Sequence, residues 1–184
     1  MSVFFDRFVK LFGRKRSIVE PRLFQVYVPE EVLNRTGSLI SSSGHKGHSH
    51  EGIVYWAGVE CDNNWTVLMV IAPNAKTSPG SYMTSPVANA MAVAKISEFN
   101  LHILAQVHGH PGEWVGHSEV DNHGAFMPYE GFFSIVVPWF GRKGLMPMAR
   151  CGVHQFQQGR FVQLTADDVQ QRFVLIPTSI DLRK

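Results

Sequence analysis

The chain has 184 residues, of which 45% are hydrophobic and 17% charged, so it can bury one core but leaves little room for a second full domain. The formal net charge is only +2, and basic residues cluster only at Arg14, Lys15 and Arg16, which argues against a nucleic-acid-binding face. Two cysteines, Cys61 and Cys151, are too few for a disulfide scaffold and lack the paired spacing of a cysteine zinc site, which indicates a cytoplasmic protein.

Residues 1–19 are predicted to form an amphipathic helical extension ahead of the main domain, residues 20–184. Apolar side chains recur there at helical spacing, with basic residues between them: Phe4, Phe5, Phe8, Val9, Leu11 and Phe12. The interspersed charges exclude a signal peptide, and no later stretch is apolar enough to span a bilayer. We expect the apolar face to pack on the chain's own body, and contact with a membrane surface or a partner is the alternative.

Strands are predicted where β-branched and aromatic residues run between turn residues. In chain order they cover residues 23–28, 52–59, 65–72, 101–107, 132–137, 148–156 and 161–164. The Asp-Asn-Asn sequence at 62–64 has the chemistry of a hairpin turn, so the two strands beside it should be antiparallel neighbours. The last two strands should form another hairpin around Gly159.

Helices are predicted where capping residues precede apolar periodicity. The first begins at Pro29 and ends near Gly37, the second follows Ser85 and ends near Asn100, and a short third follows Thr165. The apolar face of the second is predicted to comprise Val87, Ala90, Met91 and Ala94. Residues 38–50 and 73–84 are predicted as loops, the first of them mobile. This order of elements predicts one α/β domain in which helices flank a mixed central β-sheet.

The sequence QVHGHPGEWVGHSEVD, residues 106–121, follows directly on a predicted buried strand and contains candidate metal ligands. His108 and His110 are two residues apart at the strand end, so both imidazoles point to the same side. Asp121 suits a third ligand position, which leaves the fourth open to water, as in catalytic zinc sites. Zinc lowers the pKa of bound water to about 7 and polarises the attacked carbonyl. The pattern therefore predicts one zinc ion per chain and hydrolytic chemistry.

Two further side chains are predicted to act beside this metal. Glu51 precedes a buried strand, where an ionisable group is costly unless it has a function or a partner, and we interpret it as the general acid/base. Ser118 is interpreted as a donor to the developing oxyanion, a contact worth about 3 to 4 kcal/mol when well placed. Glu119 is the second choice for the acid/base role.

This set resembles the signature of the JAMM (MPN-plus) zinc metalloproteases, a glutamate far upstream of HxHx7SxxD. The downstream part is matched position for position by His108, His110, Ser118 and Asp121. The upstream part usually reads ExxGxxxG, and EGIVYWAG keeps Glu51 and Gly58 but has Val54 at the first glycine. The resemblance covers roughly residues 23–164 and implies a cytidine-deaminase-like fold.

The resemblance also implies a function: cleavage of isopeptide or peptide bonds after the C-terminal glycine of a ubiquitin-like protein, in deconjugation or precursor processing. Small prokaryotic members are most similar in length. They imply activating and conjugating enzymes as operon partners, a role for some in antiphage defence, or sulfur-carrier proteins as substrates. By similarity, residues 73–84 and 139–148 would flank the cleft and hold an extended substrate tail.

Other interpretations are weighed on the same residues. A non-catalytic MPN scaffold usually lacks a complete ligand set, and a zinc deaminase would need HxE and PCxxC motifs that are absent. DNA repair proteins with a related HxHP motif are a weaker alternative, because the net charge is low. An accessory metal site at His45, His48 and His50 is the alternative to a solvated loop, and we favour the loop because its glycines and serines give ligands no rigid support.

Overall fold

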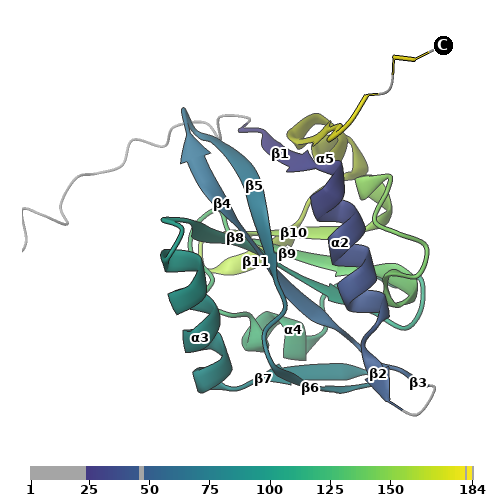
Figure 1. Cartoon of the computed structure of the whole chain (residues 1–184). Coiled ribbons are helices and arrows are strands. Elements are labelled where there is room, and N and C mark those ends of the chain that lie inside the picture. Colours follow the sequence, from purple (N-terminus) through teal and green to yellow (C-terminus); the bar gives the residue numbers. More distant parts are fainter. Residues whose placement is uncertain (1–23, 46–47, 181, 184) are drawn as a thin grey trace, which may run out of the picture.

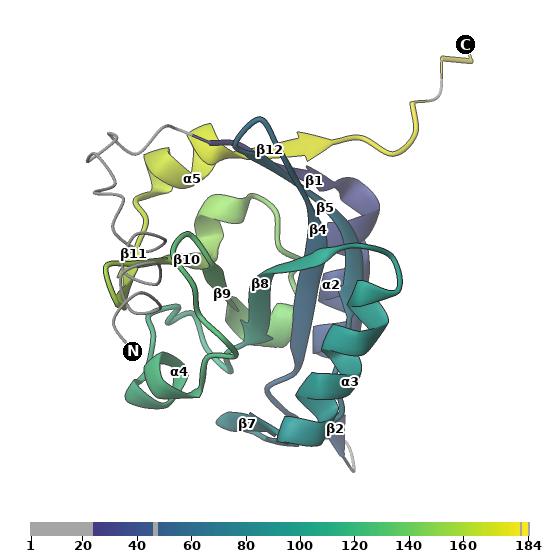
Figure 2. The ribbon, with the colours of Figure 1, turned by 90° about the vertical axis from the view of Figure 1, so that its left-hand side faces the viewer.

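The computed structural model describes residues 24–45, 48–180 and 182–183, so the predicted helix over residues 1–19 lies outside the described part. A mixed eight-stranded sheet forms the centre of the domain, and helices α2 and α3 lie on either side of strands β4 and β5 (Figure 1). The view turned by 90° shows α5 beside β12, at the opposite end of the domain from α4 (Figure 2). The predicted mixed sheet with flanking helices is therefore confirmed.

The strand order across the sheet is β11-β10-β9-β8-β4-β5-β1-β12. The bounds in chain order are β1 Val26–Pro29, β4 Ile53–Cys61, β5 Asn64–Ile71, β8 His102–Gly109, β9 Phe133–Val137, β10 Gly152–Gln157, β11 Arg160–Gln163 and β12 Phe173–Ile176. Neighbours are parallel in the pairs β8–β9, β1–β5 and β1–β12, and antiparallel elsewhere in this sheet. Two small hairpins lie apart from it: β2 Gly44–His45 with β3 His48–Ser49, and β6 Ala75–Ser78 with β7 Ser81–Thr84.

Four α-helices are described: α2 Glu30–Ser41, α3 Pro86–Ser97, α4 Glu119–Gly124 and α5 Ala166–Arg172. Two 3-10 turns, η1 Pro138–Gly141 and η2 Met148–Arg150, lie between β9 and β10. The predicted caps are present, since the Ser85 hydroxyl accepts a hydrogen bond from the Ala88 amide and the Thr165 hydroxyl accepts one from the Asp168 amide, each at 3.1 Å. Within the described residues, no helix is long and apolar enough to cross a membrane.

The two helices beside β4 bury opposite faces of that strand. On the α2 side the Trp56 indole donates to the Thr36 hydroxyl at 2.8 Å, inside the main core. On the α3 side the Tyr55 hydroxyl donates to Asn89 Oδ1 at 2.8 Å, above a smaller apolar cluster around Ile53. Because both faces are covered, this strand is apolar on both sides and holds the chain segment that precedes it in a fixed place.

Several predictions about local structure are wrong. Helix α2 continues past Gly37 to Ser41, because Gly37 is buried against the η1 segment instead of ending the helix. Residues 73–84 form the β6–β7 hairpin, part of the predicted mobile loop pairs as β2–β3, and residues 148–150 are a 3-10 turn instead of strand. Helix α4 and strand β12 were not predicted.

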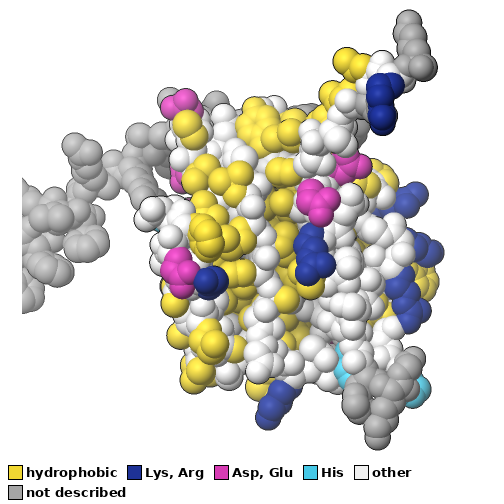
Figure 3. All heavy atoms as spheres, in the orientation of Figure 1, with side chains coloured by type: hydrophobic (Ala, Val, Ile, Leu, Met, Phe, Trp, Pro, Cys, Tyr) yellow, Lys and Arg dark blue, Asp and Glu magenta, His cyan; other side chains and the backbone are white. Residues whose placement is uncertain are grey.

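The predicted apolar face of α3 is also wrong. Val87 and Met91 are 70% and 69% exposed, whereas the helix buries Ala88, Ala92 and Ile96. Small alanine side chains let the helix axis approach the sheet closely, and the larger residues are left outside. Figure 3 shows apolar side chains gathered on the surface over α3 and the neighbouring strands.

Candidate metal centre

The register of the central strands brings the upstream glutamate to the histidines. Ile53 pairs with His108 across the antiparallel strands β4 and β8, and the Gly109 amide donates to the Gly52 carbonyl at 3.1 Å. Glu51 follows on from this register, and its carboxyl group lies close enough to His110 for the two charges to interact. A Cβ at Gly109 would lie 2.6 Å from the Ile40 side chain and 3.2 Å from Phe140 Cα, so the residue between the two histidines must be glycine.

Helix α4 brings the aspartate to the same point. Its N-cap is Ser118, whose hydroxyl accepts from the Asp121 amide at 3.1 Å, while the Ser118 amide and hydroxyl both donate to Asp121 Oδ2 at 2.8 Å. This reciprocal capping box fixes the carboxylate at the helix N-terminus. The Asp121 side chain is therefore held in one orientation, facing the end of β8.

The three side chains converge on one small volume. His108 Nε2 lies 3.2 Å from His110 Nε2 and 3.2 Å from Asp121 Oδ1, and His110 Nε2 lies 3.4 Å from Asp121 Oδ2. All three residues are buried. Around a tetrahedral zinc with ligand distances of 2.0 to 2.1 Å, donor atoms are about 3.3 Å apart. The donor set therefore fits a tetrahedral metal with one position left over.

Hydrogen bonding supports the same fit on one histidine. His110 Nδ1 donates to the Trp114 carbonyl at 3.1 Å, which leaves the Nε2 lone pair directed at the cluster. His108 Nδ1 is buried and has no hydrogen-bond partner within the described residues. In the described part of the chain, these residues form the one group of three or more His, Cys, Asp or Glu side chains close enough to hold a metal ion.

The protonation states of two candidate ligands also suit metal binding. Burial holds the pKa of His108 below its usual value, so the imidazole is neutral. Burial alone would raise the pKa of Asp121, but contact with the His108 and His110 imidazoles holds it well below its usual range. Burial likewise opposes the charged form of His110, and the Asp121 carboxylate outweighs it and raises that pKa. A neutral imidazole and an ionised carboxylate are the forms that coordinate metals.

Glu51 lies beside these residues, with its backbone anchored to a hairpin. Its amide donates to the Ser78 carbonyl of β6 at 2.9 Å, and its side chain is only 6% exposed. Burial raises the pKa of Glu51 to about 7, a shift that nearby His110 reduces and nearby Asp121 increases. A carboxyl group with this pKa can both accept and donate a proton near neutral pH.

A partly buried polar network lies beside the candidate ligands. His117 Nδ1 donates to Asn122 Oδ1 at 3.0 Å, and its Nε2 accepts from the Ser134 hydroxyl at 2.9 Å. Gln106 Nε2 donates to the same Ser134 oxygen at 3.0 Å. The network ties α4 to β9 and β8. His117 is therefore a structural link between the element that carries Asp121 and the sheet.

Two loops meet beside His110. The Phe140 amide donates to the His110 carbonyl at 2.7 Å, and the Trp139 amide donates to the Gly112 carbonyl at 3.0 Å. Trp139 and Phe140 both have left-handed backbone angles, with φ of 57° and 53°, which is strained for bulky residues. Trp114 is 58% exposed and stacks on His110, with ring centroids 5.2 Å apart. Two exposed aromatic residues, Trp114 and Trp139, thus belong to the loops that meet beside the histidines.

The structure brings together all the residues that the sequence singled out: Glu51, His108, His110, Ser118 and Asp121. It also adds Tyr82 of β7, whose ring centroid lies 5.0 Å from that of His108. Tyr82 was missed because its hairpin was predicted as a loop, although the alternation in Ser-Tyr-Met-Thr is a weak strand signal.

Other candidate residues lie apart from the cluster or contribute to packing. Glu119 is exposed at the start of α4. His50 Nδ1 contacts the Thr77 hydroxyl at 3.0 Å, which links the β2–β3 segment to β6. Cys151 is buried and its thiol donates to the Leu145 carbonyl, so it packs in the core.

Comparison with known proteins identifies one relative of informative similarity. The chain is 30% identical over 122 residues to "Probable metalloprotease y4jG" of Sinorhizobium fredii (strain NBRC 101917 / NGR234), an alignment covering 64% of this chain and 74% of that protein. No family model matches the chain.

Two solved structures share the fold at low sequence identity, and a third matches more weakly. Protein DSY2949 from Desulfitobacterium hafniense matches with a TM-score of 0.61 and 14% identity, covering 83% of this chain and 94% of that one. A protein from Salinibacter ruber matches with a TM-score of 0.52 and 13% identity, covering 75% and 88%. AF2198, a JAB1/MPN domain protein from Archaeoglobus fulgidus, matches with a TM-score of 0.42 and 15% identity, covering 77% and 96%.

The relative and the donor cluster agree on the chemistry. The alignment covers 74% of the metalloprotease relative. The cluster of His108, His110 and Asp121 provides a group that can hold the metal such an enzyme requires. The chain belongs to the JAMM/MPN family of metalloproteases.

Proposed function

We propose that the protein is a zinc-dependent peptidase that cleaves after the C-terminal glycine of a ubiquitin-like protein. His108, His110 and Asp121 hold the zinc, and Glu51 is the general acid/base. The observation that carries this proposal is the combination of three donor atoms at tetrahedral spacing with a buried carboxyl group whose pKa is raised to about 7.

When bound, zinc supplies a nucleophile from water at neutral pH and polarises the scissile carbonyl. Glu51 takes a proton on its carboxylate from the attacking water and then delivers it to the leaving amine. Its near-neutral pKa suits both transfers, because a much stronger acid would not hold the proton and a much weaker one would not release it. Asp121 and His108 contribute by staying ionised and neutral, respectively.

Glu51 is preferred to Glu119 on burial. Glu51 is enclosed at the strand end, two residues before the partner of His108, whereas Glu119 is exposed on the first turn of α4. A proton shuttle must lie within hydrogen-bond reach of the reacting water and away from competing solvent. Both conditions favour Glu51.

The substrate part of the proposal rests on the β6–β7 hairpin and the segment 139–148. The hairpin is anchored at the centre through the bond from the Glu51 amide to the Ser78 carbonyl and through Tyr82 beside His108. The segment is anchored through the bond from Phe140 to His110. An extended glycine-ended tail can add as a further strand on a two-stranded hairpin, which gives backbone hydrogen bonds without selecting side chains. Sulfur-carrier proteins are the alternative substrate class. Activating and conjugating enzymes encoded in the same operon stay a prediction.

The test is cleavage of a ubiquitin-like protein fused through its C-terminal glycine to a reporter, with bound metal measured on every sample. Glu51→Gln keeps the shape of the side chain but cannot shuttle a proton. We expect it to lose at least about 100-fold in rate and to keep its zinc. Glu119→Gln is the matched control and should cleave like the wild type.

Two outcomes would contradict the proposal. Unchanged cleavage by Glu51→Gln or by the chelated enzyme would remove the mechanism. Failure of the zinc-loaded wild type to cleave any of several such fusions would remove the substrate class and leave the metal centre in place.

A further inference from the structure

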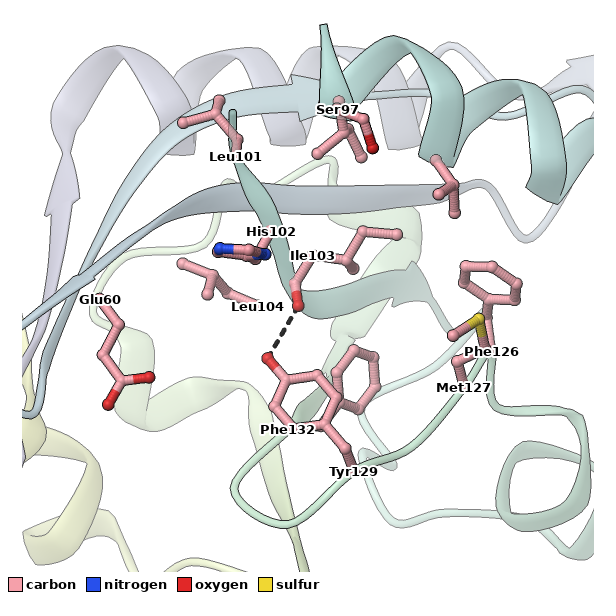
Figure 4. A pocket seen from close by; sticks show the side chains of 12 residues that line it. Glu60, Ser97, Leu101, His102, Ile103, Leu104, Phe126, Met127, Tyr129 and Phe132 are labelled. Atoms are coloured by element: carbon pink, nitrogen blue, oxygen red, sulfur yellow. Dashed lines mark hydrogen bonds between the residues drawn. The ribbon is translucent and has the colours of Figure 1, made fainter. Parts of the chain in front are cut away.

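A groove of about 430 Å³ lies between the C-terminal half of α3, the start of β8 and the segment that follows α4 (Figure 4). Its lining is mainly apolar, including Val93, Ile96, Ile103, Phe126 and Met127. None of the candidate metal ligands lines it. The groove is therefore a separate feature of the domain, and the proposed catalytic reaction does not use it.

The rim of this groove includes a hydrogen-bonded residue, Tyr129, and an exposed apolar one, Met127. The Tyr129 hydroxyl donates to the Ile103 carbonyl at 2.8 Å, which fixes the segment after α4 to β8 (Figure 4). Met127 is 68% exposed, a large fraction for an apolar side chain beside other apolar residues. Glu60 is the one Asp, Glu, Lys or Arg side chain in the described lining. The surface thus suits an apolar segment that also carries positive charge.

The described chain begins at Phe24, two ring contacts away from this groove. The Phe24 ring lies 5.3 Å from the Trp65 ring, and Trp65 pairs with Glu60 across β4 and β5. The Trp65 ring in turn lies 6.3 Å from that of Tyr129. Two ring contacts therefore connect Phe24, through Trp65, to Tyr129 of the groove lining. The backbone pairing of Trp65 with Glu60 connects the same ring to the acidic residue.

The preceding sequence has the composition that the groove suits. Phe4, Phe5, Phe8 and Leu11 recur at helical spacing, and Arg7, Lys10 and Arg14 to Arg16 supply positive charge. A helix over residues 3–12 would be about 15 Å long. The residues between it and Phe24 can span up to about 36 Å when extended. That reach is longer than the path from Phe24 through the two ring contacts to Tyr129.

We propose that the apolar stripe of residues 4–12 docks in this groove of its own chain, with its basic residues toward Glu60. The four features that support the assignment are the apolar lining, the single acidic residue, the position of Phe24 and the length of the intervening chain. The proposal concerns an intramolecular surface and is independent of the peptidase reaction.

Hydrogen–deuterium exchange on the full chain tests the proposal without using activity. The perturbed variant is Phe5→Asp with Phe8→Asp, which places charge in the stripe. The matched control is Gly13→Asp with Ser17→Asp, which adds the same charge outside it. We expect amides of residues 101–104 and 126–129 to exchange at least about tenfold faster in the stripe variant and at the wild-type rate in the control. Met127→Glu, a change at an exposed position, should produce the same increase from the groove side.

Three outcomes would overturn the proposal. Equal exchange in the wild type, the stripe variant and Met127→Glu would show that the segment does not cover the groove. Protection that rises with protein concentration, together with a dimer in light scattering, would assign the groove to a second copy. Binding of the wild type, but not the stripe variant, to phosphatidylglycerol vesicles with unchanged groove exchange in solution would assign the stripe to a membrane surface.

Discussion

Replacing Ser118 with alanine separates two roles for its hydroxyl. In the structure this hydroxyl donates to Asp121 Oδ2 at 2.8 Å and accepts from the Asp121 amide at 3.1 Å. A hydrogen bond to a charged group is worth about 1.5 to 3 kcal/mol. Loss of a supporting contact to a metal ligand typically costs 10- to 100-fold in affinity, which is about 1.4 to 2.7 kcal/mol. The two ranges agree, so we expect Ser118→Ala to bind zinc about 10- to 100-fold more weakly.

Competition with a chromophoric chelator measures this affinity, and chemical denaturation of the metal-free protein measures stability. Loss of the helix cap should lower the free energy of unfolding by about 1 kcal/mol. Thr165→Ala is a matched control, because Thr165 and Asp168 form the same capping box on α5. It should weaken α5 and leave zinc affinity unchanged. If Ser118→Ala instead keeps full zinc affinity and loses about 100- to 1,000-fold in kcat, the hydroxyl serves the oxyanion and the positioning argument is wrong.

Trp114→Ala removes an aromatic contact worth about 0.5 to 1.5 kcal/mol from a candidate ligand, so zinc affinity should fall up to about tenfold and recover in Trp114→Phe, as read by chelator competition. Gly58→Ala places a Cβ 1.8 Å from the Thr66 carbonyl oxygen, so the free energy of unfolding measured by urea denaturation should fall by about 1 to 3 kcal/mol. Burial lowers the pKa of His117 and of His154 from 6.5 to about 4, so the unfolded chain binds protons that the native imidazoles do not bind. Their contribution to stability should be fully present above pH 6.5 and lost toward pH 4, as read from urea midpoints against pH in Glu51→Gln, which lacks the opposing effect of the raised Glu51 pKa.

The donor cluster was predictable because its geometry is mostly local. His108 and His110 follow from side-chain alternation at a strand end, which needs no knowledge of the fold. The reciprocal cap between Ser118 and Asp121 is also local, since the two residues are three apart, but it was not predicted because helix α4 was not recognised. The oxyanion role of Ser118 stays a prediction. Glu51 was chosen from its place before a buried strand and from the family resemblance, but its position beside the histidines depends on the pairing of β4 with β8, which is a long-range contact.

The parts that the sequence did not predict depend on packing or on long-range pairing. Strand β12 pairs with the parallel strand β1 at the edge of the described sheet, at a sequence separation of almost 150 residues. The β6–β7 hairpin has short strands of mixed polarity, so alternation alone does not separate it from a loop. On α3, helical periodicity identified an apolar stripe on the wrong side, because the alanine face fits closer to the sheet and nothing local reports that fit.

The departure from the upstream family pattern has a packing explanation. Val54 stands where the first glycine is common, and its side chain is buried in the main core on the α2 side of β4. Gly58, which the pattern keeps, lies where the register between β4 and β5 shifts, and the Thr66 carbonyl occupies the space of a side chain there. The first position therefore tolerates a core residue, whereas the second cannot accept any side chain. Since Ile53 still pairs with His108, the valine leaves the backbone path that delivers Glu51 unchanged.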